Sequence, residues 1–84
     1  MLEIFKNYLQ KEDYYIIIYS NFIYIYNYLD IIKFTDTYIS LKLKELKINI
    51  YGKDLLITKL EQKEIMIKGY IEKLEKKYEW LYNN

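Results

Sequence analysis

The sequence predicts an all-β fold, a small antiparallel β-sandwich or roll of about 7–8 short strands. Residues that favour strands, chiefly Ile, Tyr and Phe, dominate the chain after position 13. Apolar and polar residues alternate between positions 38 and 51, which is typical of strands with one buried face. Turn-forming residues interrupt these segments so often that no crossover helix fits between them, which excludes a parallel α/β sheet.

Each expected strand is bounded by residues that favour turns. The first two strands, at 14–19 and 22–28, are joined by Ser20 and Asn21 as a tight turn. Further strands are expected at 31–34, 38–44, 47–51, 55–60 and 64–68, and the last of them continues to about residue 76. Breaks between these strands are expected at 35–37, 52–54 and 61–63.

The two ends of the chain are expected to differ from a core of about residues 14–78. Apolar residues recur at helical spacing in residues 1–13, which predicts a short N-terminal helix or arm. Residues 70–84 fit either a strand or a helix; we expect a strand to about residue 76 and then a frayed or helical tail. The chain, 1–84, is expected to be a single domain.

The alternation assigns side chains to the two faces of the sheet. On the strand at 38–44, the residues expected to point inward are Ile39, Leu41 and Leu43, and those expected outward are Ser40, Lys42 and Lys44. On the strand at 47–51, those expected inward are Ile48 and Ile50, and those expected outward are Lys47, Asn49 and Tyr51.

A hairpin of these two strands gathers a basic surface from Lys42, Lys44, Lys47 and Tyr51. Lysines beside an aromatic ring on a sheet are how small barrels hold single strands, so the alternative function is a single-stranded nucleic-acid-binding small β-barrel. Exposed lysine is also the ordinary means of keeping a strand soluble. Because 13 Lys balance 12 acidic residues and leave a net charge of +1, we expect nucleic acid not to be the partner.

The composition removes most catalytic chemistry. The chain contains no histidine and no cysteine, so the usual general base near neutral pH, the usual nucleophile and base pairs, zinc ligands and disulfides are all absent. Its 2 glycines cannot form a glycine-rich phosphate loop. We therefore expect no enzyme, no metal, no cofactor and no small-molecule substrate.

The uncharged run at 14–29 raises the alternative of a membrane span. It is shorter than the roughly 20 residues that a spanning helix needs, and it includes Ser and Asn. Two adjacent strands explain this run better. The first residues lack the apolar stretch and cleavage site of a signal peptide.

A weak internal repeat has the form Ile-x-Ile-x followed by Asn27, Gly52 or Gly69. Asn and Gly tolerate a positive φ, which a strand needs at a sharp corner. Apolar residues resume shortly after each copy, so the repeat predicts a strand, a corner and a strand that turns back over the core.

Four segments in order resemble those of the YabP/YqfC family of sporulation proteins, and the chain looks closest to YqfC. The segments are 23–28, 31–34, 46–57 and 64–71. The residues that carry the motifs and their turns are Asn27, Gly52, Lys53, Asp54, Leu55 and Gly69. The chain departs from the family pattern at Tyr26 and Tyr28, where Glu and His are usual.

The resemblance implies a non-enzymatic sporulation protein that acts in the mother cell of an endospore-forming bacterium. It implies a structural or assembly adaptor in the cytoplasm, at the periphery of the membrane around the forespore. The partner that it implies is a membrane-anchored sporulation protein of the YqfD type. So small a domain is marginally stable, and a second copy of the chain is a further expected source of burial.

Overall fold

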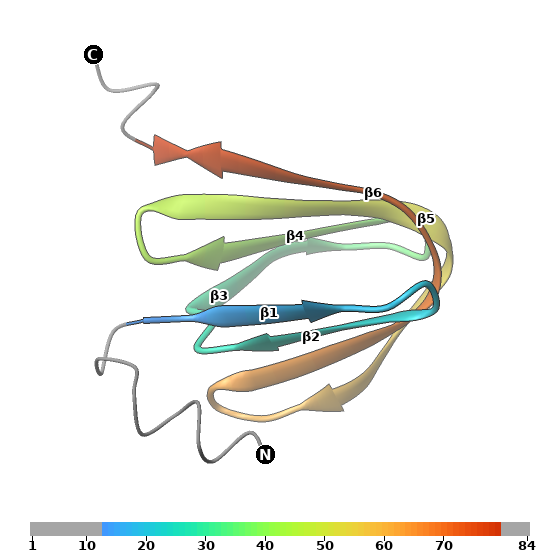
Figure 1. Ribbon diagram of the computed structural model, residues 1–84, viewed down its shortest axis with the longest axis horizontal. Helices are drawn as coiled ribbons and strands as arrows, with labels where there is room; N and C mark the ends of the chain where they lie inside the picture. The colour runs from blue at the N-terminus through green and yellow to red at the C-terminus, as the bar shows by residue number, and fades with distance from the viewer. Residues whose placement is uncertain (1–12, 80–84) are drawn as a thin grey trace.

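The computed structural model describes residues 13–79, and this part of the chain is all-β, as predicted. The strands are β1 (Tyr15–Ile18), β2 (Phe22–Tyr26), β3 (Asp30–Phe34), β4 (Tyr38–Leu43), β5 (Leu46–Leu60) and β6 (Glu64–Tyr78). All pair antiparallel in one six-stranded sheet, in the order β1-β2-β6-β5-β4-β3 (Figure 1). The helix or arm predicted at 1–13 and the tail predicted beyond β6 lie, except for Asp13 and Glu79, outside the described residues.

The uncharged run at 14–29 forms two paired strands, as the two-strand interpretation predicted. Ser20 and Asn21 lie at the turn between them, where the Tyr19 amide donates to the Phe22 carbonyl at 2.8 Å. Between residues 13 and 79 we find no helix that is both long and apolar enough to span a membrane.

The long strands β5 and β6 give the sheet its shape. Each has 15 residues and bends near its middle (Figure 1). Before the bend β5 pairs with both β4 and β6, and after it β6 is its one partner among the strands of residues 13–79. Strand β6 likewise pairs with β2 only over Glu64–Lys68. The two halves of the sheet share one core. The fold is therefore one bent open sheet of six strands, whereas we predicted a sandwich or roll of about 7–8 strands.

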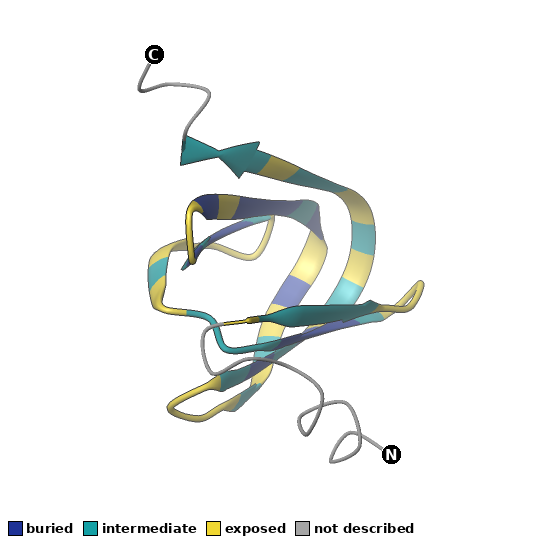
Figure 2. Ribbon diagram, turned by 60° about the vertical axis from the view of Figure 1, so that its left-hand side comes forward, coloured by how far each residue is buried: buried dark blue, intermediate teal, exposed yellow. Residues whose placement is uncertain are grey.

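The core consists of isoleucine and leucine side chains from both halves of the sheet. Figure 2 shows where the buried residues lie along the ribbon. Its members are Ile23, Ile25, Ile39, Leu41, Leu43, Leu46, Ile48, Ile50, Leu55, Ile65 and Ile67. The inward faces predicted for the strands at 38–44 and 47–51 are therefore confirmed. Each fully buried side chain of this size contributes about 2–3 kcal/mol, which is how so short a chain offsets its loss of conformational entropy.

Residues 52–54, predicted as a break between two strands, instead continue β5, which bulges at residues 54–55. Gly52 lies opposite Ile71 and Leu56 lies opposite Lys68, so β5 has one more residue than β6 between these pairs. Asp54 takes a φ of +53°, a conformation that Asp tolerates better than most residues. An extra residue in one strand bends the ladder, and this bulge coincides with the bend of the sheet.

Both glycines lie at this bend, for different reasons. Gly69 has a φ of +141°, and a Cβ there would lie 2.8 Å from the Asp54 carbonyl oxygen. Gly52 does not have a positive φ, so that prediction was wrong for it. A Cβ on Gly52 would lie 2.1 Å from the Tyr70 carbonyl oxygen, so close backbone approach requires glycine there. Asn27, at the end of β2, has the predicted positive φ, +69°.

Two turns from opposite halves of the sheet attach to the bend through backbone hydrogen bonds. The Leu55 amide donates to the Asp36 carbonyl at 2.8 Å, which fixes the turn between β3 and β4. The Gly69 amide donates to the Asn21 carbonyl at 3.1 Å, which fixes the turn between β1 and β2. The bend therefore anchors both outer hairpins.

Replacing either glycine by alanine should lower the free energy of unfolding by about 3 kcal/mol or more. At Gly52 the added Cβ meets a backbone carbonyl, and at Gly69 it meets another carbonyl in an unfavourable φ region. Urea unfolding followed by circular dichroism measures the change. Lys53→Ala is the matched control, because its exposed side chain lies at the same bend and should change stability by less than about 0.5 kcal/mol. Equal stability of the glycine variants and the control would contradict this account of the bend.

Candidate functional site

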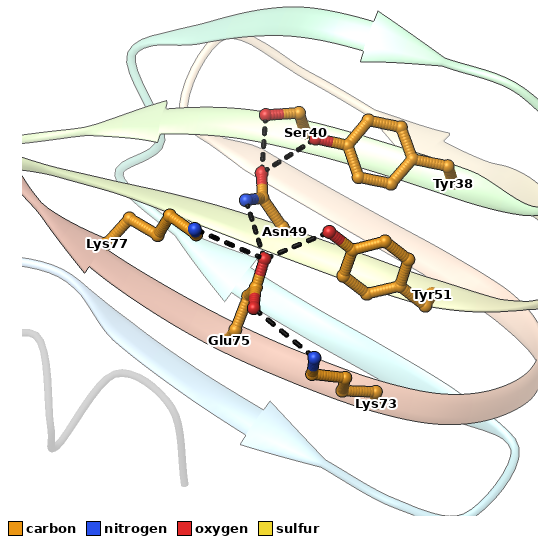
Figure 3. Close-up of polar contacts among 7 residues, drawn as sticks. All are labelled: Tyr38, Ser40, Asn49, Tyr51, Lys73, Glu75 and Lys77. Carbon is orange, nitrogen blue, oxygen red and sulfur yellow. Dashed lines mark hydrogen bonds and ion pairs between the residues drawn. The ribbon is translucent and has the colours of Figure 1, made fainter.

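Outward side chains of β4, β5 and β6 line up in three rows across the sheet, before the bend of β5 and after that of β6. The register places Ser40, Asn49 and Glu75 in one row, Tyr38, Tyr51 and Lys73 in a second, and Lys42, Lys47 and Lys77 in a third. We call these nine residues the outer patch. Seven of them are drawn in Figure 3.

Asn49 is the centre of the outer patch (Figure 3). The hydroxyl of Ser40 donates to its Oδ1 atom at 2.8 Å, and the hydroxyl of Tyr38 donates to the same atom at 3.0 Å. Both Ser40 and Asn49 point outward, as predicted, but the solvent exposure expected of that face is absent. They lie on the outer face but are only 4% and 6% exposed. Their buried polar atoms are satisfied by each other and by their neighbours, which such burial requires.

Glu75 collects the donors on the other side of Asn49. Its Oε1 atom accepts from the Asn49 amide at 3.1 Å and from the Tyr51 hydroxyl at 2.9 Å. Lys73 lies 3.4 Å from Oε2, and Lys77 lies 4.0 Å from Oε1. The hydrogen bonds from Asn49 and then Tyr51 lower the pKa of Glu75, and the bond to Glu75 raises the pKa of Tyr51.

Aromatic rings and ammonium groups form the row next to Asn49. The Tyr38 and Tyr51 ring centroids are 5.0 Å apart, with the planes tilted by 44°. Lys33 lies 5.9 Å from the Tyr38 centroid, and Lys73 lies 5.4 Å from the Tyr51 centroid. Both distances fit cation–π contacts. The tyrosines are thus fixed at their hydroxyl groups and flanked by positive charge on both sides.

The predicted basic surface is partly assembled. Lys42 and Lys47 lie directly opposite each other in the β4–β5 hairpin, as predicted, with Tyr51 further along the same face. Lys44 lies in the turn that joins the two strands. Lys42 pairs with Glu79, so the surface is less basic than predicted.

Sequence reasoning missed the contribution of β6 to this surface. Lys73, Glu75 and Lys77 belong to the segment that fitted either a strand or a helix. Asn49, the partner of Glu75 on β5, is 26 residues away in sequence, and the register of the two strands is set between them by the turn at 61–63 and the bulge. Only the alternation of charge in that segment hinted at an exposed face.

The motif residues are mostly gathered at the bend beside the outer patch. Gly52, Lys53, Asp54 and Leu55 lie in β5 against Gly69 of β6. The Lys53 ammonium is 3.8 Å from the Glu72 carboxylate, and both side chains are exposed. Asn27 lies apart, at the end of β2, where its amide donates to the Lys63 carbonyl.

A separate polar contact lies in the other half of the sheet. The Tyr24 hydroxyl donates to the Glu64 carboxylate, and Tyr24 is only 4% exposed. Burial, followed by this hydrogen bond, raises the pKa of Tyr24. Within residues 13–79, no group of three or more Asp and Glu side chains is placed to hold a metal ion.

The chain is a small all-β protein with one bent six-stranded sheet, and the outer patch is a polar surface on that sheet. A model of the YabP family matches residues 10–79, so the chain belongs to the YabP family. This membership is consistent with a sporulation-related protein. Neither the curated proteins nor the solved structures give a match.

Glu75→Gln tests whether the ionised carboxylate of Glu75 stabilises the fold, because such a stabilisation depends on pH. The folded pKa of Glu75 is lowered from 4.5, so its contribution to stability is fully present above about pH 4.5 and is lost as pH falls through the folded pKa. We expect the variant to melt a few degrees below the wild type near neutral pH, and the difference to shrink in acid. Thermal unfolding across the pH range measures it.

Glu72→Gln is the control, since Glu72 lies on the same strand and its ion pair with Lys53 is longer and exposed. It should change the melting temperature little at any pH. If the difference in melting temperature between wild type and Glu75→Gln stays constant from neutral to acid pH, the ionised carboxylate of Glu75 does not stabilise the fold as we expect.

Proposed function

We propose that the protein is a non-enzymatic adaptor of sporulation that belongs to the YqfC branch of its family. In this proposal it acts in the cytoplasm of the mother cell, at the periphery of the membrane around the forespore. Its partner is a membrane-anchored sporulation protein of the YqfD type. The family match over residues 10–79 and the motif residues around the bend support this proposal.

The observation that carries the adaptor role is the edge formed by β3. Strand β3 pairs with β4 and, among the described residues, with no other strand. Leu29 and Ile32 are 57% and 47% exposed, and Phe34 is 47% exposed. We call these three exposed residues the apolar cluster of the β3 edge. Exposed apolar side chains along a strand edge promote aggregation of an isolated protein, whereas a protein that docks can bury them against its partner.

The register shift between Ile31 and Lys33 interrupts the ladder of β3 with β4. A bulge of this kind disfavours the addition of a regular strand at the edge. Binding there would therefore rest on the apolar side chains, and an apolar segment of the membrane-anchored partner is the complementary ligand.

Deleting the gene should sharply reduce the yield of heat-resistant spores and leave vegetative growth unchanged. Complementation with Phe34→Lys should fail to restore the spores, because a charge in the apolar cluster opposes docking. Leu60→Lys is the matched control, since Leu60 is 54% exposed at the far end of β5, and it should restore them. Circular dichroism confirms that both variants are folded. A normal spore yield in the deletion strain would refute the sporulation role, and full rescue by Phe34→Lys would refute docking through β3.

A pull-down from sporulating mother cells with the wild type and with Phe34→Lys tests partner and compartment together. The membrane-anchored partner should be recovered with the wild type and lost with the variant. Recovery of the same partner by both would place the docking surface elsewhere.

One observation favours the alternative function, the binding of single-stranded nucleic acid. The register extends the predicted pair Lys42 and Lys47 to a third lysine, Lys77, across three strands. The carboxylates of Glu75 and Glu79 beside these lysines offset much of their charge. We therefore rank this function below the adaptor.

An oligonucleotide titration at low salt decides between the two. If the alternative holds, Lys47→Glu should weaken binding about tenfold or more and lower the salt dependence. If the wild type does not bind the oligonucleotide at low salt, the nucleic-acid-binding function is excluded.

A further inference from the structure

Among the described residues, the second half of β6 has a neighbouring strand on one side only. Strand β2 pairs with β6 only as far as Lys68, and beyond Gly69 no described strand lies on that side of β6. On its other side, β6 pairs with β5 in unbroken register from Lys73 to Tyr78. Figure 1 shows this half of β6 at the outer margin of the sheet.

The hydrogen bonds of β5 fix which backbone groups face this edge. The Gly52 amide points to the β4 side, where it donates to the carbonyl of Thr37 just before β4. The Glu79 amide points to the β5 side, where it donates to the carbonyl of Glu45 just before β5. In an antiparallel ladder the amide and carbonyl of one residue point to the same side, and the side alternates along the strand. The amides and carbonyls of Leu74 and Lys76 therefore face away from β5, toward the open edge.

The other free edges are less suited to a regular ladder. Strand β1 has only 4 residues. Strand β3 has a register shift between Ile31 and Lys33, and the second half of β5 has one between Ile57 and Lys59. Short and bulged edges resist the addition of a strand. Strand β6 has a register shift as well, since Glu72 is an extra residue opposite Tyr51 and Gly52, but from Lys73 to Tyr78 it keeps the longest regular stretch of these edges.

The charges along this edge are complementary to those of the same segment running in the opposite direction. We propose that a second copy of the chain docks on β6, antiparallel, with the two copies of Leu74 opposite each other. Lys73 then lies opposite Glu75 of the second copy, and Glu72 lies opposite Lys76. A two-fold axis through the Leu74 pair repeats each contact, as expected of an isologous dimer.

Neighbouring registers of the same pairing are unfavourable. Sliding the second copy by two residues in one direction places Glu75 opposite Glu75 and Lys73 opposite Lys77. Sliding it by two in the other direction places Lys73 opposite Lys73. Like charges opposite each other destabilise a ladder, so charge favours the register about Leu74 over both of these neighbouring registers.

The outward amides fit this register. Leu74 pairs with Leu74 through two hydrogen bonds, because both its amide and its carbonyl face the edge. The amide of Lys76 faces the carbonyl of Glu72 in the second copy. The interface is a single short ladder, so we expect a dissociation constant in the range of about 1–100 µM.

Sedimentation equilibrium of the full chain over a concentration series measures the dimer. Lys73→Glu should weaken it about tenfold or more, because it sets like charges opposite each other twice. Lys68→Glu is the matched control, since Lys68 carries the same charge on the same strand where both sides are already paired. It should leave the dissociation constant within about twofold of the wild type.

Lys76→Pro removes one outward amide while its neighbours keep their bonds to β5, and Lys76→Gln removes the charge alone. The proline variant should weaken the dimer more than the glutamine variant. Should the proline variant fail to fold, hydrogen exchange on the wild type gives the same information, because the Leu74 and Lys76 amides should gain protection as concentration rises. A monomer at all concentrations up to about 1 mM, or a dimer that Lys73→Glu leaves unchanged and in which these amides gain no protection, overturns the proposal.

Discussion

The close contact of β5 with β6 at the bend is the constraint on which the rest of the structure depends. Gly52 and Gly69 have no Cβ, so the carbonyls of Tyr70 and Asp54 can approach where any other residue would clash. This approach lets two 15-residue strands turn without separating. The turn brings the apolar residues of both halves into one core, which a flat sheet of this size could not bury. The hairpin turns that hydrogen-bond to the bend then fix the outer strands.

The outer patch follows from the same geometry. Because β6 returns alongside β5 after the bend, Glu75 is placed next to Asn49, and its carboxylate receives donors from β5 and β6 at once. Asn49 is only 6% exposed, yet each polar group of its side chain has a partner. Satisfied polar rows of this kind set the register of neighbouring strands as firmly as apolar rows do. The hydrogen bonds of the outer patch therefore help to fix the register of β4, β5 and β6.

The sequence was sufficient for those features that depend on local pattern. The two-residue period predicted the inward Ile39, Leu41 and Leu43, and the positive φ of Asn27 and Gly69 followed from residue type. Features that depend on distant partners were not accessible. The segment at 52–54, where the bulge of β5 begins, looks like a turn until β6 is known to lie opposite it. Likewise Asn49 looks solvent-exposed until Glu75 and Tyr51 are placed around it.

The bend that creates the core also creates edges. A strand that bends out of one half of a sheet loses a neighbour there, so β5 after the bulge and β6 after Gly69 are each paired on one side only among the described residues. With β1 and β3, the sheet then has more unpaired backbone than a flat sheet of six strands. Bulges and shortness protect three of these edges, whereas the regular part of β6 carries alternating charges. Charged side chains at an edge oppose pairing with most strands but favour a strand whose charges have the complementary pattern. The charges therefore select a partner as well as prevent aggregation.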